Sequence, residues 1–179
     1  MAFRLTIHSR RAFSLIELTI VMLMIGLIAA ITMPRFNAQI RVVRLEAAAR
    51  QLATHIDLIR TTAVNEARTT TLACAPNQYS SPDVDFAERI GTPISVQVQQ
   101  TYDSSIALIA DFNSLAQLTF DFEGIPHAGG SPLTSAGMIS VTSGNEQFVV
   151  SIAVGTGRVS VSQTNLAGEP VVGVSEESP

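Results

Sequence analysis

The chain has 179 residues, of which 46% are apolar and 15% are charged, a length that predicts one domain or one domain with an appendage. Its eleven basic residues are all arginines and stand against fifteen acidic residues, so the charge balance does not indicate bulk binding of nucleic acid. The single cysteine excludes an internal disulfide and a cysteine-rich metal site.

The apolar residues concentrate near the N-terminus. Residues 13–33 contain one charged side chain, Glu17, and the charged residues before them are all arginines. About twenty apolar residues in a helix span a bilayer core of roughly 30 Å, and a basic flank keeps its end of a span in the cytoplasm. We therefore expect residues 13–33 to cross a membrane, with the remainder of the chain on the far side.

Three interpretations of this N-terminus compete. A secretory signal or signal anchor and a twin-arginine signal built on residues 9–13 both lack an A-x-A-like cleavage pattern after the apolar run. Neither gives Glu17 a role, although an acid near the centre of an apolar span costs about 2.5–3.5 kcal/mol. In the third interpretation, cleavage between Ala12 and Phe13 creates an amine that neutralises Glu17 of a neighbouring subunit.

The residues from Arg10 to Glu17, followed by the apolar run, resemble the class III signal of type IV pilins and type II secretion pseudopilins. The resemblance implies that a prepilin peptidase cuts between Ala12 and Phe13 and that the new amine of Phe13 is methylated. It also implies a role for Glu17 in assembly and a helix kink at Pro34. Alanine at position 12 departs from the family's usual glycine, which suggests slower processing.

An amphipathic helix is predicted over residues 34–68, continuing into the head. Pro34 lacks a backbone donor and crowds the preceding turn, so a kink or break is expected there. Beyond it, apolar residues recur at alternating spacings of three and four, which is typical of one helix face. These residues are Val42, Leu45, Ala49, Leu52, Ile56, Ile59 and Ala63.

Residues 69–162 are predicted to form a β-rich head. Alternating and β-branched segments predict strands at residues 69–74, 94–98, 105–110, 115–122, 138–142, 147–154 and 158–162. Residues 76–93 are rich in Pro, Ser, Asp and Asn and are expected to form a loop. Residues 163–179 hold three acids without a pattern and are expected to form a flexible acidic tail. The predicted fold class is α+β, a long membrane-spanning N-terminal helix packed on an antiparallel β-sheet head.

Parts of the head also resemble H-type minor pseudopilins and FimT-like minor pilins. The similar stretches are Ile59–Ala63 leading into Thr71 and Leu72, Phe120–Gly124, and Val149–Ile152 leading to Gly157–Val159. This resemblance implies two antiparallel sheets packed against the helix.

Signals for an enzyme or a cofactor are weak in this sequence. The three histidines, at positions 8, 55 and 127, lack metal-ligand spacing, and no G-x-S-x-G nucleophile motif occurs. Asp121 and Glu123 are predicted to share one strand face, where a solvated surface is favoured over a catalytic pair.

Two further positions have weak chemical signals. Asp83 and Asp85, with Glu88 nearby, form a weak calcium candidate in the 83–88 loop, because oxygen ligands suit Ca²⁺ but the spacing is not that of an EF-hand. Cys74 is expected to be buried and inert.

We therefore predict a non-enzymatic structural subunit without a cofactor, a minor pseudopilin near the tip of a type II secretion pseudopilus. It is expected as a single-pass protein of the bacterial inner membrane with its head in the periplasm. Its predicted partners are the prepilin peptidase, other pilins or pseudopilins, and that membrane. Nucleic acid is not expected, because no basic residue follows Arg158 and phosphates require clustered Arg or Lys. The alternatives are a minor pilin of a type IV pilus (assembly or DNA uptake), a signal-anchored or twin-arginine-exported periplasmic binding domain, and an anchored hydrolase.

Overall fold

The structure is a computed structural model that describes residues 14–86 and 89–165. The predicted leader, residues 1–12, and the part of the predicted tail beyond residue 165 lie outside these ranges. The chain divides between Gln39 and Ile40 into two compact units. From Leu15 to Gln39 the first unit is helical, and the described residues of the second unit contain the remainder of that helix and the strands of both sheets.

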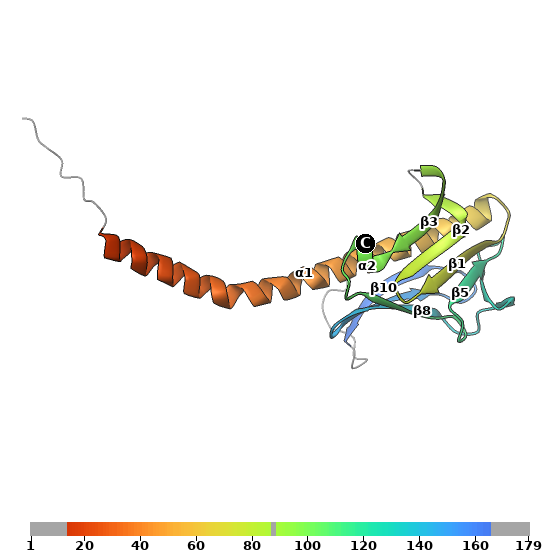
Figure 1. The fold of residues 1–179 in the computed structure, drawn as a ribbon. Helices are drawn as coiled ribbons and strands as arrows, with labels where there is room; N and C mark the ends of the chain where they lie inside the picture. Colours follow the sequence, from red (N-terminus) through yellow and green to blue (C-terminus); the bar gives the residue numbers. More distant parts are fainter. Residues whose placement is uncertain (1–13, 87–88, 166–179) are drawn as a thin grey trace, which may run out of the picture. The chain divides into compact units, whose positions relative to one another are not determined.

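One helix, α1, spans Leu15–Asn65 and is continuous through Pro34 (Figure 1). Within the second unit its predicted apolar stripe is confirmed. The six stripe residues from Leu45 to Ala63 are at most 1% exposed, and Val42 packs against the same core. Burial of one large aliphatic side chain contributes about 1.5–3 kcal/mol, so this face anchors the helix on the head.

The C-terminal end of α1 lies three residues before the predicted end at Arg68. The backbone N–H of Arg68 donates to the carbonyl of Ala63, 3.1 Å away, and Ala67 between them has a φ of 48°. This six-to-one bond across a left-handed residue is the Schellman arrangement, in which glycine is the usual occupant. Ala67 therefore ends the helix at a conformational cost that glycine would avoid.

Two antiparallel sheets follow the helix. The larger sheet has the order β3-β2-β1-β5-β6-β7, and the smaller has the order β10-β9-β8-β4. The strands of the larger sheet are β1 Thr70–Ala75, β2 Gln78–Phe86, β3 Arg89–Gln97, β5 Gln117–Phe120, β6 Pro126–Ala128 and β7 Ser131–Pro132. Those of the smaller sheet are β4 Ala107–Asp111, β8 Gly137–Ser143, β9 Glu146–Ile152 and β10 Val159–Asn165, and the short helix α2 spans Val98–Thr101. Every strand predicted from the sequence overlaps one of these, and β10 continues three residues beyond the predicted end at Ser162.

The loop predicted over residues 76–93 was wrong, because these residues form most of the β2–β3 hairpin. Tyr79, Ser81 and Val84 are buried, while Ser80, Pro82 and Asp83 between them are more exposed. The pairing register shifts between Ser81 and Asp85, and such a bulge accommodates Pro82 within a strand.

Both sheets and α1 share one hydrophobic core. Leu72 and Leu118 from the larger sheet join Val141 and Val150 from the smaller sheet in a single buried cluster with the helix stripe. A buried hydrogen bond from Thr70 Oγ1 to the carbonyl oxygen of Ile59, 3.0 Å long, links β1 directly to α1. The C-terminal half of α1 lies against the strands (Figure 1) and shares their buried core, which confirms the predicted antiparallel head on a helix.

Candidate functional site

The N-terminal part of α1 presents apolar side chains to its surroundings. Residues 14–30 are exposed throughout, and their large apolar side chains retain 47–81% of their accessible surface. Glu17 is also exposed, and it has no hydrogen-bond or ion-pair partner among the described residues. Ala12 and Phe13 lie outside those residues, so the predicted cleavage site and the assembly role of Glu17 stay predictions.

The described residues contain no helix that is both long enough and apolar enough to cross a membrane. The kink predicted at Pro34 also stays a prediction. The backbone there is helical on both sides, and the side chain of Pro34 lies outside the described part of the chain.

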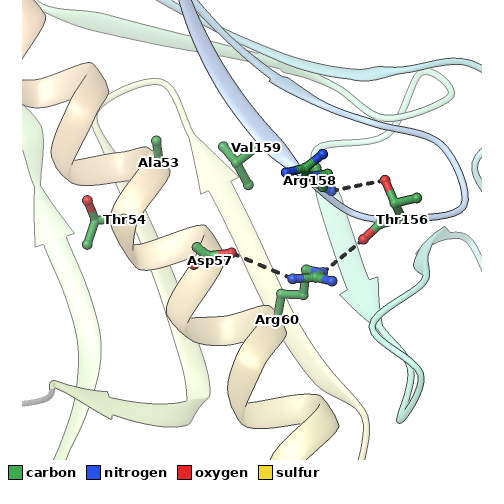
Figure 2. A pocket seen from close by; sticks show the side chains of 7 residues that line it. All are labelled: Ala53, Thr54, Asp57, Arg60, Thr156, Arg158 and Val159. Atoms are coloured by element: carbon green, nitrogen blue, oxygen red, sulfur yellow. Dashed lines mark hydrogen bonds and ion pairs between the residues drawn. The ribbon is translucent and has the colours of Figure 1, made fainter. Parts of the chain in front are cut away.

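A pocket of about 550 Å³ opens between the C-terminal half of α1 and the connection from β9 to β10 (Figure 2). We refer to it as the arginine pocket. Its lining residues are Ala53, Thr54, Asp57 and Arg60 from α1, and Thr156, Arg158 and Val159 from the other wall.

Arg60 holds the two walls of the arginine pocket together. Its Nε donates to the carbonyl oxygen of Thr156 at 2.9 Å, and its Nη1 lies 3.7 Å from Oδ1 of Asp57 (Figure 2). Gly157 makes this approach possible, because a Cβ there would lie 2.6 Å from the carbonyl oxygen of Gly124 and 3.0 Å from Cδ of Arg60. Its φ of 62° is also a conformation that favours glycine.

Arg158 is the open cation of the arginine pocket. Its backbone N–H donates weakly to Oγ1 of Thr156, at 3.4 Å, but its exposed guanidinium has no partner among the described residues. The pocket therefore contains two guanidinium groups and one carboxylate, and its chemistry suits an anionic group bound by charge-assisted hydrogen bonds. Sequence reasoning missed this site, because Arg60 and Arg158 are brought together only by the fold. The available signal was that Arg158 is one of only two arginines after Arg68.

Asp121 and Glu123 do not share a strand face, because β5 ends at Phe120 and both residues lie in the turn before β6. Asp121 Oδ1 accepts from the backbone N–H groups of Glu123 and Ile125, at 3.0 and 2.8 Å. Its Oδ2 lies 3.1 Å from Nε2 of His127. A short polar side chain that bonds the backbone ahead of it is a turn-forming device, so Asp121 organises this turn instead of forming a carboxylate pair.

The two aspartates of the weak calcium candidate both hold backbone groups. Asp83 Oδ2 accepts from the N–H of Thr71 at 2.8 Å, and Asp85 Oδ2 accepts from the N–H of Gly91 at 2.6 Å. Glu88 lies outside the described residues. In the described part of the chain, no group of three or more His, Cys, Asp or Glu residues is placed to hold a metal ion.

Cys74 is half-buried on β1 and packs against the core. Burial raises the pKa of its thiol to about 12, so the thiol is protonated at neutral pH and is a poor nucleophile. This agrees with the predicted inertness, although the side chain is less buried than expected.

His55 faces the larger sheet. Its Nδ1 lies 2.8 Å from the hydroxyl of Tyr79, and its ring packs edge-on against Phe86 at a centroid distance of 5.6 Å. Burial lowers the pKa of His55 and raises that of Tyr79. This histidine is therefore part of the packing between helix and sheet.

A long helix with an exposed apolar N-terminal part, packed further along on two antiparallel sheets, is the architecture of pilin-like filament subunits. The chain belongs to the family of the type II transport protein GspH, whose model matches residues 48–161. It is therefore a pilin-like protein of the GspH/FimT type, as its sequence motifs predicted.

No curated protein matches the sequence. Two crystal structures of the type IV minor pilin FimU from Pseudomonas aeruginosa are similar to the chain, with TM-scores of 0.46 and 0.48 at 16% and 17% identity. Each match covers 65% of this chain, and 90% or 87% of the FimU chain.

Proposed function

We propose that this chain is a non-enzymatic minor subunit of a pilin-like filament, and that the filament is the pseudopilus of a type II secretion system. The observation that carries the proposal is the contrast within α1. Its stripe from Leu45 to Ala63 is buried in the chain's own head, whereas the apolar residues from Leu15 to Leu27 are exposed. A contiguous apolar surface of this kind marks an interaction site with lipid or with other chains.

The proposal continues with the route of assembly. The precursor inserts residues 13–33 into the inner membrane with its head in the periplasm, and the prepilin peptidase cuts between Ala12 and Phe13. The apolar helix then leaves lipid and packs against the same segment of neighbouring subunits. Glu17 pairs there with the amine of a neighbour's Phe13, which offsets the cost of placing an acid in an apolar surrounding.

Processing is tested by the intact mass of the membrane-extracted protein, with and without the prepilin peptidase. A chain that begins at a methylated Phe13 only when the peptidase is present supports the proposed route. A chain that keeps residues 1–12 under both conditions contradicts it.

Assembly is tested with Glu17→Ala and a matched control, Glu46→Ala, which removes an acid that pairs with Arg50 on the same helix. We expect Glu17→Ala to be processed and inserted normally but incorporated into filaments several-fold less than the wild type. Glu46→Ala should be incorporated normally. Equal incorporation of both variants would contradict the role of Glu17.

The type of machine is tested by deleting the gene and measuring protein secretion and pilus-dependent motility in the same strain. Loss of secretion with intact motility is expected for a pseudopilus. Loss of motility alone would instead assign the chain to a type IV pilus.

A further inference from the structure

We infer that the arginine pocket binds a carboxylate side chain from a neighbouring pilin-like subunit of different sequence. The inference rests on the proposed function, since filament assembly supplies the neighbour. It adds a contact between heads to the helix packing that drives assembly.

Of the two guanidinium groups in the arginine pocket, only that of Arg158 is available to bind an anion. Arg60 is engaged by the carbonyl oxygen of Thr156 and by Asp57, whereas the guanidinium of Arg158 has no partner within the described ranges. A carboxylate matches the planar fork of a guanidinium and accepts two parallel hydrogen bonds from it. The carboxylate of Asp57 repels a second anion, and this repulsion is weaker for a singly charged carboxylate than for a doubly charged phosphate.

The shape of the pocket suits an amino-acid side chain. Ala53 and Val159 are half-buried and provide an apolar floor for the methylene groups of a glutamate. The hydroxyl of Thr54 is occupied, because it donates to the carbonyl oxygen of Arg50 at 3.0 Å. The bond from Arg60 to Thr156 fixes the two walls before anything binds, and such preorganisation reduces the entropy lost on association.

The charge of the head favours a subunit of different sequence over a second copy. Residues 69–162 contain two arginines against eight acidic residues. Two such heads repel each other, while a less acidic neighbour can present a single carboxylate at a lower electrostatic cost. The unpaired guanidinium of Arg158 then favours a neighbour that carries a carboxylate at the matching position, and this contact also fixes how the two heads are aligned.

The absence of lysine from the chain provides a sharp test. Arg158→Lys introduces the only side-chain amine, which a carbodiimide joins directly to a carboxylate in contact with it. The full-length variant is expressed with its partner subunits, filaments are treated with the carbodiimide in membranes, and joined peptides are identified by mass spectrometry. The matched control is Arg50→Lys, on the same helix, where the wild-type Arg50 Nη2 lies 2.8 Å from Oε1 of Glu46.

We expect Arg158→Lys to yield a link to one Asp or Glu of another pilin-like subunit, and Arg50→Lys to yield the link to Glu46 within its own chain. Links from Arg158→Lys only to Asp57, only to a second copy of the chain, or to nothing would overturn the inference. We also expect Arg158→Gln to weaken association with that subunit about tenfold, with Arg50→Gln unchanged. If Arg158→Gln instead abolishes a salt-dependent shift of duplex DNA, the pocket binds phosphate and the inference is overturned.

Incorporation into filaments is measured in the same samples, so the two hypotheses fail differently. Normal incorporation of Arg158→Lys without a link to another subunit overturns the pocket contact and leaves the proposed function intact. Failure of the wild-type chain to enter filaments overturns the proposed function and the contact together.

Discussion

The Nε atom of Arg60 donates to the carbonyl oxygen of Thr156 across 2.9 Å, and this bond joins positions 96 residues apart. The same side chain lies 3.3 Å from the point where a Cβ of residue 124 would be, and 3.0 Å from that of residue 157. One arginine therefore closes α1, the β5–β6 turn and the β9–β10 turn against each other. The same side chain lines the arginine pocket.

Arg60→Met should lower the free energy of unfolding by about 1–2 kcal/mol, because it removes a charged hydrogen bond but retains most of the packing volume. The Arg60 side chain is 28% exposed, so the loss of stability should be at the low end for a hydrogen bond to a charged group. The measurement is denaturant unfolding of the full chain in detergent, followed by circular dichroism. Arg50→Met, which breaks only an exposed pair with Glu46, should change stability by less than about 0.5 kcal/mol. Equal effects would show that the bond to Thr156 adds nothing.

Gly157→Ala should destabilise the head more than Gly144→Ala. Both glycines have a positive φ, 62° and 61°, so alanine carries the same conformational cost of about 1 kcal/mol at either position. A Cβ at position 144 meets open space, whereas one at position 157 would lie 2.6 Å from the carbonyl oxygen of Gly124. The clash should add about 1–3 kcal/mol to Gly157→Ala. Thermal unfolding of the two variants measures the difference. Equal melting temperatures would show that the β9–β10 turn shifts to relieve the clash at no cost in stability.

Ala67→Gly should stabilise the protein by about 1 kcal/mol, because glycine adopts the φ of 48° that ends α1 without steric cost. The control uses the same substitution at an exposed position inside the helix. Ala47→Gly should destabilise by about 1 kcal/mol, the usual cost of glycine in a helix interior. We expect the melting temperature to rise for Ala67→Gly and to fall for Ala47→Gly. A lower melting temperature for both variants would contradict the Schellman motif at the C-terminal end of α1.

The turn around Asp121 should weaken in acid. Burial opposes ionisation of Asp121, but the backbone hydrogen bonds from Ile125 and Glu123 and the contact with His127 outweigh it and lower its pKa. A carboxyl group whose pKa is lower in the folded state contributes stability above its unfolded pKa of about 3.9 and loses it as pH falls through the folded value.

Asp121→Asn should therefore melt at a lower temperature than the wild type at neutral pH, with the gap narrowing below about pH 4. Glu123→Gln is the matched control in the same turn, where only the backbone N–H of Glu123 takes part in a described hydrogen bond. Its melting temperature should follow that of the wild type at every pH. A constant gap for Asp121→Asn would show that the ionised carboxylate is not the stabilising group.

Cys74 should react slowly in the folded protein. With a pKa of about 12, only about one thiol in ten thousand is ionised near pH 8, and the thiolate is the reacting form. Alkylation followed by intact mass should be at least about a hundredfold slower than in the same chain unfolded by denaturant. Similar rates in the two states would show that the thiol is not protected by burial.

Local patterns in the sequence were sufficient for the head part of α1 and for most of the strands. The stripe from Leu45 to Ala63 predicted a buried helix face, because a 3.6-residue period places those side chains on one side whatever they pack against. Alternation predicted the strands in the same way. The prediction of a loop at the β2–β3 hairpin was wrong, because Pro82, Asp83 and Asp85 are residue types that favour turns. They are accommodated in a strand by the pairing with β3 and by the bulge between Ser81 and Asp85.

The sequence by itself determined the class of protein. The arginines before Phe13, the acid at Glu17 and the apolar run are adjacent in the chain, so their spacing is readable without a fold. Only the tertiary structure decided which head residues meet. Arg60 lies on α1 and Arg158 follows β9, far apart in the chain, and the packing of α1 against the β9–β10 connection places both in one pocket. Such a contact depends on every turn between the two residues, so no local pattern could reveal it.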